Sequence, residues 1–189
     1  IAVETIAKTA PQVADAARLA AAVEAANAAV IEAALNGLGK PGMGCTATCA
    51  YIENDTIAIA HVGDSRAYLL HEGTLIRVTR DHSYVEELVD AGEITADEAR
   101  VHPNRSVITR ALGSDPAMYA DHFTLHIDEG DRLILCSDGL SSMIPDSDIE
   151  NIATQSSTAQ ICVDNLVDAA LAAGGHDNVT VVVVDLVDD

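Results

Sequence analysis

The amino-acid sequence predicts one α/β domain in which paired helices flank antiparallel strands. Three observations predict this fold class. An alanine-rich segment near the start has apolar residues at the three- and four-residue spacing of an amphipathic helix. Two pairs of short strand-like runs follow it, and each pair is typical of a β-hairpin. Near the end, an amphipathic helical segment leads through a glycine-rich turn into the strongest strand pattern of the chain.

The first part of the chain is predicted to form one long helix and then two hairpins. The helix is expected over residues 11–38, because alanine favours helices and because glycines and a proline follow the periodic stretch. Residues 46–52 and 56–61 are β-rich runs on either side of a polar turn signal, so they predict a hairpin. Residues 66–71 and 74–79 predict a second hairpin in the same way.

Residues 81–117 interrupt the strand pattern. Short helices are expected at residues 84–91 and 95–100, and the second has the Thr-x-x-Glu spacing of a capping box. A long polar insertion within a β protein is typical of a segment that faces a substrate. We therefore expect residues 81–117 to form a flap within the domain.

The remaining part of the chain alternates again between strands and helices. Strand patterns occupy residues 120–127 and 132–136, and amphipathic helices are expected at residues 147–155 and 159–173. A Gly-Gly turn then leads into a strand over residues 179–187. Since no repeat or linker interrupts this series, residues 1–189 are expected to form a single domain.

The composition excludes several classes of function. The chain has 189 residues, 49% of them hydrophobic, which suits a domain of the usual ~100–200 residues with a sizeable core. Its 10 Lys and Arg residues against 30 Asp and Glu residues give a net charge of −20. With Lys8 and Lys40 as its lysines, the sequence has no basic patch for nucleic acid or for an anionic membrane surface. No apolar run approaches the ~20 residues of a membrane span.

The four cysteines are not arranged as a disulfide framework or a zinc site. No Cys-x-x-Cys pair is present, and no matched set of Cys and His residues follows at the spacing of zinc ligands. We expect reduced, mostly buried thiols, and a cytoplasmic location follows from that expectation. The cysteines are Cys45, Cys49, Cys136 and Cys162.

Three aspartates, Asp64, Asp138 and Asp177, lie where predicted strands end or begin, each with a glycine within two positions. A strand end holds a side chain firmly, and a neighbouring glycine permits close approach of the backbone. Carboxylates that converge repel one another unless a cation lies between them, and oxygen ligands favour Mg²⁺ or Mn²⁺. Taken singly, each aspartate is explained equally well as a turn former.

The motifs around these aspartates occur in an ordered series. In this order and spacing they resemble the bacterial form of the metal-dependent protein phosphatases (PPM), the type-2C Ser/Thr family. The resemblance extends from about residue 42 to residue 187, and the insertion at residues 81–117 lies where that family carries its flap. The motifs are Gly42-Met-Gly-Cys-Thr-Ala-Thr48, His61-Val-Gly-Asp-Ser-Arg-Ala-Tyr68, Ile108-Thr-Arg-Ala-Leu-Gly113, Leu135-Cys-Ser-Asp-Gly-Leu140 and Gly174-Gly-His-Asp-Asn-Val-Thr180.

The resemblance implies a fold, an activity and a metal centre. The fold is an αββα sandwich of two antiparallel sheets flanked by helix pairs. The activity is hydrolysis of phosphoserine and phosphothreonine by metal-activated water, with phosphoproteins made by bacterial Ser/Thr kinases as substrates. Asp138 and Asp177 are then ligands of the first of two catalytic Mg²⁺ or Mn²⁺ ions, and Asp64 with Asp138 is a ligand of a third, weaker ion.

Three neighbouring residues are candidates for additional roles in the site. His176 occupies a variable position of the family motif, so it is not assigned a role. Arg66 is either an orienting partner of Asp64 or a surface ion-pair residue of little energetic weight. Ser142 stands where many relatives carry Asp, which predicts a weaker third metal site.

The family's first segment has no counterpart in this sequence. That segment supplies strands, an Arg that grips the substrate phosphate and an Asp that bridges both catalytic ions. We therefore expect an N-terminally incomplete phosphatase of low intrinsic activity, with a sheet edge exposed for association. Three alternatives stay open: another chain supplies the segment, the protein is an inactive pseudophosphatase that binds phosphoproteins, or it is an acidic domain without a metal.

Overall fold

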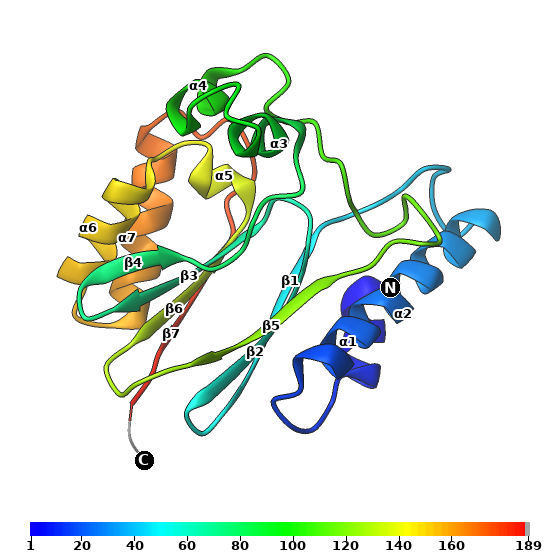
Figure 1. Cartoon of the computed structure of the whole chain (residues 1–189), viewed down its shortest axis with the longest axis horizontal. Helices are drawn as coiled ribbons and strands as arrows, with labels where there is room; N and C mark the ends of the chain where they lie inside the picture. Colours follow the sequence, from blue (N-terminus) through cyan, green and yellow to red (C-terminus); the bar gives the residue numbers. More distant parts are fainter. Residues whose placement is uncertain (188–189) are drawn as a thin grey trace. The chain divides into compact units, whose positions relative to one another are not determined.

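The structure is a computed structural model that describes residues 1–187, and the chain divides into two compact units (Figure 1). The first unit comprises Ile1–Asp64 and Asp81–His126, and the second comprises Ser65–Arg80 and the chain from Ile127 onward. Each unit contains one antiparallel sheet with its own helices, which confirms the predicted class of helices with two antiparallel sheets. None of the helices within the described residues is long and apolar enough to cross a membrane.

The sheet of the first unit has three strands in the order β1-β2-β5. Its central strand is buried over residues 57–62, because a neighbouring strand lies on each side and helix α2 (Ala16–Leu35) packs against it. The apolar side chains of β2 and α2 form the core of this unit. The strands are β1 (Ala47–Glu53), β2 (Thr56–Val62) and β5 (Asp121–His126).

The first unit begins with two helices, α1 (Ala2–Thr9) and α2 (Ala16–Leu35), in place of the single helix expected from Pro11. The expected start at Pro11 was wrong, because α2 begins only at Ala16. Proline disfavours a helical conformation of the residue before it, so the preceding helix α1 ends before Pro11. A new helix then begins where the side chain of Asp15 accepts a hydrogen bond from the Arg18 N–H at 3.0 Å.

The two short helices expected between residues 81 and 117 are present as α3 (Tyr84–Asp90) and α4 (Ala96–Val101). The predicted capping box is also present, since Thr95 accepts from the Glu98 N–H and the Glu98 carboxylate accepts from the Thr95 N–H. Isolated bridges pair Ser83 with Ile108 and Cys45 with Leu112, so both ends of the segment are tied to the unit. Its role as a flap stays a prediction.

The sheet of the second unit has four strands in the order β4-β3-β6-β7, all antiparallel. Two helices, α6 and α7, pack against it and form a second core. Strand β7 pairs only with β6 among the described strands, so it is an edge of this sheet. The elements are β3 (Arg66–His71), β4 (Thr74–Arg77), β6 (Arg132–Cys136), α5 (Asp138–Ser141), α6 (Asp146–Gln155), α7 (Ala159–Ala172) and β7 (Val181–Asp185).

Two details of the second unit differ from expectation. Strand β7 (Val181–Asp185) is shorter than the strand predicted over residues 179–187. Thr180 accepts a hydrogen bond from the Ser137 N–H, which lies beyond the end of β6, so it is not part of the β6–β7 ladder. Asp138 was expected in an interruption after a strand, and it is the first residue of the helical turn α5.

Candidate active site

Asp138 and Asp177 lie at the same end of the second unit's sheet. Strand β6 ends at Cys136, which pairs with Val181 at the start of β7. Because the two strands are antiparallel, the residues that follow β6 are placed beside those that precede β7. The register therefore brings the backbone of Asp138 close to the turn that contains Asp177.

Hydrogen bonds and a close backbone contact hold these two segments together. The Ser137 N–H donates to the Thr180 carbonyl at 3.0 Å, and the Thr180 N–H donates to the Ser137 Oγ at 3.0 Å. The same Oγ donates to the Asn178 carbonyl at 3.1 Å. A Cβ atom at Gly139 would lie 2.3 Å from the Asn178 carbonyl oxygen, so this approach requires glycine.

The two carboxylates differ in exposure. Asp138 is half-buried, whereas Asp177 is exposed and its Oδ1 accepts from the Asn178 N–H at 2.7 Å. The latter bond is the local turn contact expected of an Asx residue, and it engages one oxygen of the carboxylate. Carboxylate oxygens are donors of the kind that suits Mg²⁺ or Mn²⁺, and the role of Asp138 and Asp177 as metal ligands stays a prediction.

Asp64 belongs to the first unit and follows the last residue of β2 by two positions. Gly63 before it has a φ of +111°, and a Cβ there would lie 2.3 Å from the Thr46 Cγ2 atom. Glycine is therefore required both by the backbone conformation and by the space beside Thr46. The chain turns sharply at this point and presents Asp64, whose side chain is half-buried.

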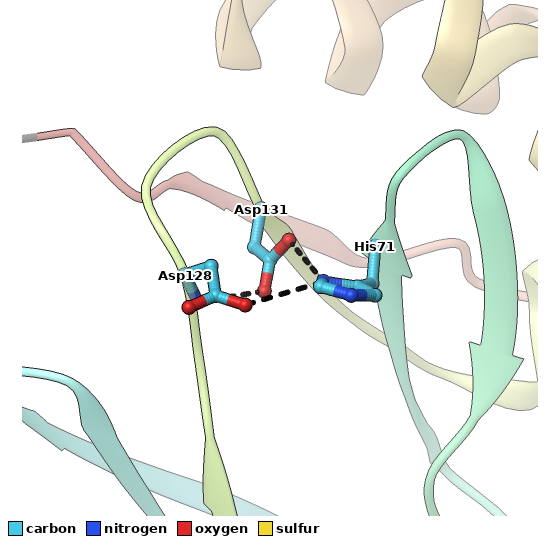
Figure 2. A group of neighbouring side chains, drawn as sticks. All are labelled: His71, Asp128 and Asp131. Carbon is cyan, nitrogen blue, oxygen red and sulfur yellow. Dashed lines mark hydrogen bonds and ion pairs between the residues drawn. The ribbon is translucent and has the colours of Figure 1, made fainter.

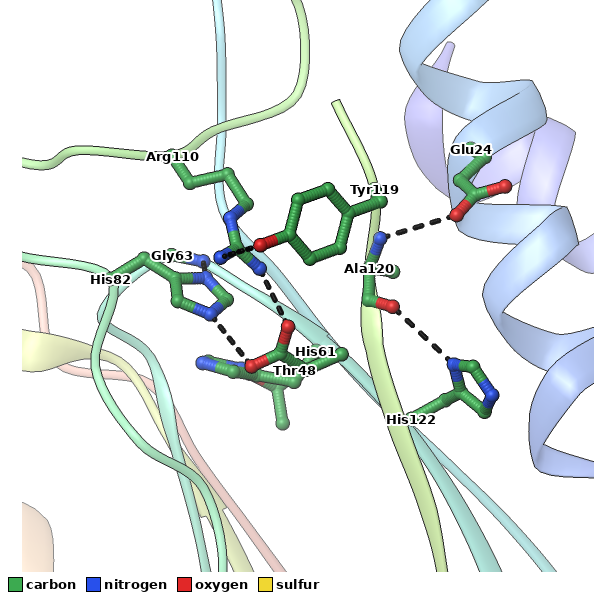
Figure 3. Close-up of polar contacts among 10 residues, drawn as sticks. Glu24, Thr48, His61, Gly63, His82, Arg110, Tyr119, Ala120 and His122 are labelled. Atoms are coloured by element: carbon green, nitrogen blue, oxygen red, sulfur yellow. Dashed lines mark hydrogen bonds and ion pairs between the residues drawn. The ribbon is translucent and has the colours of Figure 1, made fainter. Parts of the chain in front are cut away.

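A buried histidine, His82, contacts both sides of Gly63, and Figure 3 shows its ring next to Gly63. The His82 N–H donates to the Gly63 carbonyl at 2.7 Å, and the Gly63 N–H donates to the His82 Nδ1 at 3.0 Å. Because Nδ1 accepts this bond, it carries no proton, and the proton is assigned to Nε2. Nε2 then donates to the Asp121 Oδ2 at 3.0 Å.

Asp121 is in turn held by an arginine, Arg110. The Arg110 guanidinium donates to Asp121 Oδ1 at 2.6 Å and to the Tyr119 hydroxyl at 2.9 Å, and it lies 4.0 Å from the Tyr119 ring centroid. Burial opposes ionisation of Asp121, but the hydrogen bonds from His82 and Arg110 hold its pKa below the ordinary value. Asp121 is therefore an anion at neutral pH.

A second histidine, His61, lies beside this network. It is fully buried, its Nδ1 is 2.9 Å from the Thr48 Oγ1 and its ring centroid is 4.9 Å from that of His82. His61 is therefore a packed residue of the first unit. Neither His82 nor Asp121 was singled out from the sequence, although His82 follows an aspartate at the start of the expected flap.

Comparison with known proteins assigns the family. The family model for protein phosphatase 2C matches residues 4–179. The chain belongs to the protein phosphatase 2C family. This confirms the resemblance that the sequence motifs indicated.

Curated relatives of this protein phosphatase 2C chain are bacterial. It is 40% identical over 144 residues to the serine/threonine phosphatase stp of Listeria welshimeri, a match that covers 76% of this chain and 57% of that protein. It is 42% identical over 175 residues to the serine/threonine protein phosphatase PstP of Mycobacterium tuberculosis, with 91% of this chain and 33% of that protein covered. The chain thus spans less than two thirds of the length of either relative.

Solved structures share the fold. The crystal structure of the Mycobacterium tuberculosis phosphatase PstP/Ppp matches with a TM-score of 0.88 and 38% identity, covering 99% of this chain and 79% of that one. A structure of the PstP catalytic domain with two manganese ions matches with a TM-score of 0.87 and 36% identity, and it covers the same shares of the two chains. The structure of Stp1 from Staphylococcus aureus matches with a TM-score of 0.89 and 30% identity, covering 98% of this chain and 77% of that one.

The cysteines of this phosphatase 2C chain are free thiols. Cys136 and Cys162 are buried, Cys49 is half-buried and Cys45 is exposed, so the expectation of mostly buried thiols holds for two of the four. Burial raises the pKa of the Cys45, Cys49 and Cys162 thiols above the ordinary value. These three thiols are therefore protonated at neutral pH and are poor nucleophiles.

Arg66 contacts residues of its own unit. It donates to the Tyr68 hydroxyl at 3.0 Å, and that hydroxyl donates to the Asp146 carboxylate at 3.0 Å. Burial raises the pKa of Tyr68, so the hydroxyl remains a donor. The orienting role of Arg66 toward Asp64 stays a prediction.

A separate group of metal-ligand type lies at the other end of the second unit's sheet, where Figure 2 shows His71, Asp128 and Asp131 turned toward one another. The His71 Nδ1 is 2.8 Å from the Asp131 Oδ1 and 4.0 Å from the Asp128 Oδ2. The second Asp131 oxygen accepts from the Asp128 N–H at 3.0 Å. Both oxygens of Asp131 are thus engaged, and the hydrogen bond to Asp131 raises the pKa of His71. The group closes the turn before β6.

Proposed function

We propose that this chain acts as a metal-dependent protein serine/threonine phosphatase. The observation that supports this most directly is the placement of Asp138 and Asp177 on two segments joined by the Ser137 and Thr180 hydrogen bonds. Two carboxylates held in this way form the start of a cation site, and the names of the bacterial relatives point to phosphoproteins as substrates.

Asp138 and Asp177 would hold the first of two Mg²⁺ or Mn²⁺ ions, and Asp64 would be a ligand of a third, weaker one. The relative that contains two manganese ions supports this choice of metal. When bound, such ions lower the pKa of water and neutralise charge on the phosphoryl oxygens. The protein fixes its carboxylates in advance, because Gly139 permits the close backbone contact that keeps Asp138 next to the Asp177 turn.

The proposed substrates are proteins phosphorylated on serine or threonine by bacterial kinases. The reaction needs no covalent intermediate, which agrees with the raised pKa of the Cys49 and Cys162 thiols. Free thiols also agree with a cytoplasmic location. The open edge of β7 is a place where another strand, from this chain or a second one, can pair.

Mn²⁺ titration calorimetry on the purified chain tests the metal site. We expect Asp138→Asn and Asp177→Asn each to weaken Mn²⁺ binding by at least roughly tenfold, since each removes a charged ligand. Asp168→Asn is the matched control, because Asp168 is exposed on α7 of the same unit. Binding that is unchanged in Asp138→Asn would contradict the assignment of Asp138.

Hydrolysis tests the activity. Release of phosphate from a phosphothreonine peptide should be slow, as expected of an incomplete phosphatase, but it should depend on Mn²⁺ and be lost in Asp138→Asn. If the peptide binds but no phosphate is released at saturating Mn²⁺, the chain is a phosphoprotein-binding pseudophosphatase and the proposed activity is wrong.

A further inference from the structure

We propose that His82 is a positioning residue that fixes the turn presenting Asp64, with Asp121 and Arg110 holding its imidazole in place. The inference rests on the proposed role of Asp64 as a metal ligand and adds to it the residues that set its direction. All of them belong to the first unit.

The turn needs such support because the β ladder ends just before it. The last pair between β1 and β2 joins Ala47 to Val62, so the Gly63 peptide groups lie beyond the regular hydrogen bonds. Gly63 also has a positive φ and the freedom of a residue without a side chain. Without further contacts, the backbone angles of Gly63 would vary, and the direction of the Asp64 side chain would vary with them.

His82 removes that freedom from both sides of the residue. Its N–H donates to the Gly63 carbonyl at 2.7 Å, and its Nδ1 accepts from the Gly63 N–H at 3.0 Å. Two hydrogen bonds from one buried residue restrict both φ and ψ of Gly63, and these angles set the direction of Asp64. His82 is 2% exposed, so water does not compete for these bonds.

The tautomer of His82 is essential to this arrangement. A proton on Nδ1 would face the Gly63 N–H, and two donors cannot form a hydrogen bond. Asp121 keeps the proton on Nε2 by accepting from it at 3.0 Å. Arg110 keeps Asp121 ionised and correctly turned.

The register of strand β5 places Asp121, and Arg110 is located within the expected flap at residues 81–117. Asp121 pairs with His61 in the β2–β5 ladder, which puts its carboxylate beside the end of β2. The Thr109 N–H donates to the His82 carbonyl at 2.9 Å, so the two ends of the 81–117 segment meet beside Gly63. The flap is thereby anchored to the turn that carries Asp64.

Two substitutions separate the roles of the imidazole nitrogens. In His82→Asn the amide oxygen takes the place of Nδ1 and can still accept from Gly63. In His82→Gln the amide reaches the place of Nε2, so it can contact Asp121 but leaves Gly63 without its acceptor. A merely structural role would make the two variants similar, whereas a positioning role makes Asn the better replacement.

The experiment measures amide hydrogen exchange at Gly63 by NMR together with Mn²⁺ affinity by calorimetry. We expect Gly63 to exchange roughly tenfold faster in His82→Gln, which is the order expected for one lost hydrogen bond, and the weaker Mn²⁺ site to lose affinity. His82→Asn should retain most of the Gly63 protection from exchange and most of the Mn²⁺ affinity. The ¹⁵N shifts of His82 in the unaltered chain should show a protonated Nε2 and an unprotonated Nδ1.

His122→Gln is the control, because His122 is exposed on the same strand as Asp121. Equal Gly63 exchange in His82→Gln and the unaltered chain would overturn the inference, as would a protonated Nδ1. If the unaltered chain bound no Mn²⁺, the proposed function would fail, while the exchange and NMR results would still decide the role of His82.

Discussion

Ser137 and Thr180 exchange two hydrogen bonds, one through the Ser137 N–H and one through its Oγ, each at 3.0 Å. Thr180 is separated from Ser137 by more than forty positions in sequence, yet this pair continues the β6–β7 contact beyond the last ladder pair, Cys136 and Val181. The two loops that carry Asp138 and Asp177 are therefore held by the sheet itself. A site built on strand ends keeps its geometry better than one built on free loops.

Gly139→Ala should disrupt this arrangement more than it destabilises the fold. The new Cβ would lie 2.3 Å from the Asn178 carbonyl oxygen, so the Asp177 turn must move. We expect Mn²⁺ affinity to fall by roughly tenfold or more, the order of loss seen when a group that orients a metal ligand is altered.

Gly73→Ala provides the control for Gly139→Ala. Gly73 has a φ of +77° and open space around it, so alanine there costs about 1 kcal/mol of backbone strain without touching the site. Its midpoint of thermal unfolding should fall while Mn²⁺ binding is retained. Equal Mn²⁺ binding in both variants would show that the Gly139 contact does not position the ligands.

The hydrogen bond between His71 and Asp131 should make the free energy of unfolding depend on pH. The pKa of His71 is raised in the folded state, first by its hydrogen bond to Asp131, so the folded state holds this proton more tightly than the unfolded chain. The stabilisation is complete below the ordinary histidine pKa of ~6.5 and is lost as the pH rises through the higher folded value. Urea unfolding across pH 5 to 9 should show this loss.

The variant His71→Gln should remove that pH dependence. His126→Gln is the control, because His126 is exposed and its Nδ1 lies 3.6 Å from an exposed Asp55 carboxylate. We expect the control to keep the profile of the unaltered chain. Identical profiles for His71→Gln and the unaltered chain would contradict the prediction.

The local features of this protein could be read from its sequence because they depend on nearby residues. The hairpin at residues 46–61, the helices α3 and α4 and the capping box of Thr95 follow from periodicity and turn chemistry. The shared site of Asp138 and Asp177 was expected only through the resemblance of their motifs to the phosphatase family, because helices α6 and α7 separate them in the chain. The start of α2 was misplaced, because the expected helix began at Pro11 and the N-cap at Asp15 was not recognised.

The features that escaped prediction depend on contacts between distant residues. His82 meets Asp121 only because β5 pairs with β2 in a register that places Asp121 opposite His61. His71 meets Asp131 across the β3–β6 pair in the same way. Strand register over such separations depends on the assembled sheet, so neither histidine could be given a partner from the sequence.

Arg132 is expected to be a major contributor to the stability of the second unit. It is 7% exposed, its Nε donates to Asp185 at 2.5 Å, and one guanidinium nitrogen donates to the Ala153 and Ser156 carbonyls at 2.6 and 3.0 Å. Arg132→Met would leave Asp185 and two carbonyls without their donor. We expect the free energy of unfolding to fall by ~3 kcal/mol.

Urea denaturation measures this loss, and Arg18→Met is the comparison. Arg18 makes an exposed ion pair with Asp15 at 3.5 Å, so its replacement should cost no more than ~1 kcal/mol. A similar cost for both variants would show that burial does not strengthen the Arg132 contacts.

Asn27 joins helix α2 to the end of the expected flap. Its Nδ2 donates to the Asp115 carbonyl at 2.8 Å and its Oδ1 accepts from the Gly113 N–H at 2.7 Å, while the residue is 2% exposed. Asn27→Ala removes both bonds and leaves the Gly113 N–H and the Asp115 carbonyl without their partner. The free energy of unfolding should fall by ~2 kcal/mol.

Hydrogen exchange distinguishes a local effect of Asn27→Ala from a general one. The Gly113 amide should exchange faster than the global unfolding rate predicts, because its acceptor is gone while α2 remains packed on β2. Asn151→Ala, at an exposed position of α6, should change neither quantity. If Gly113 exchange in Asn27→Ala rose only in proportion to the loss of global stability, Asn27 would support the fold without holding the flap end in place.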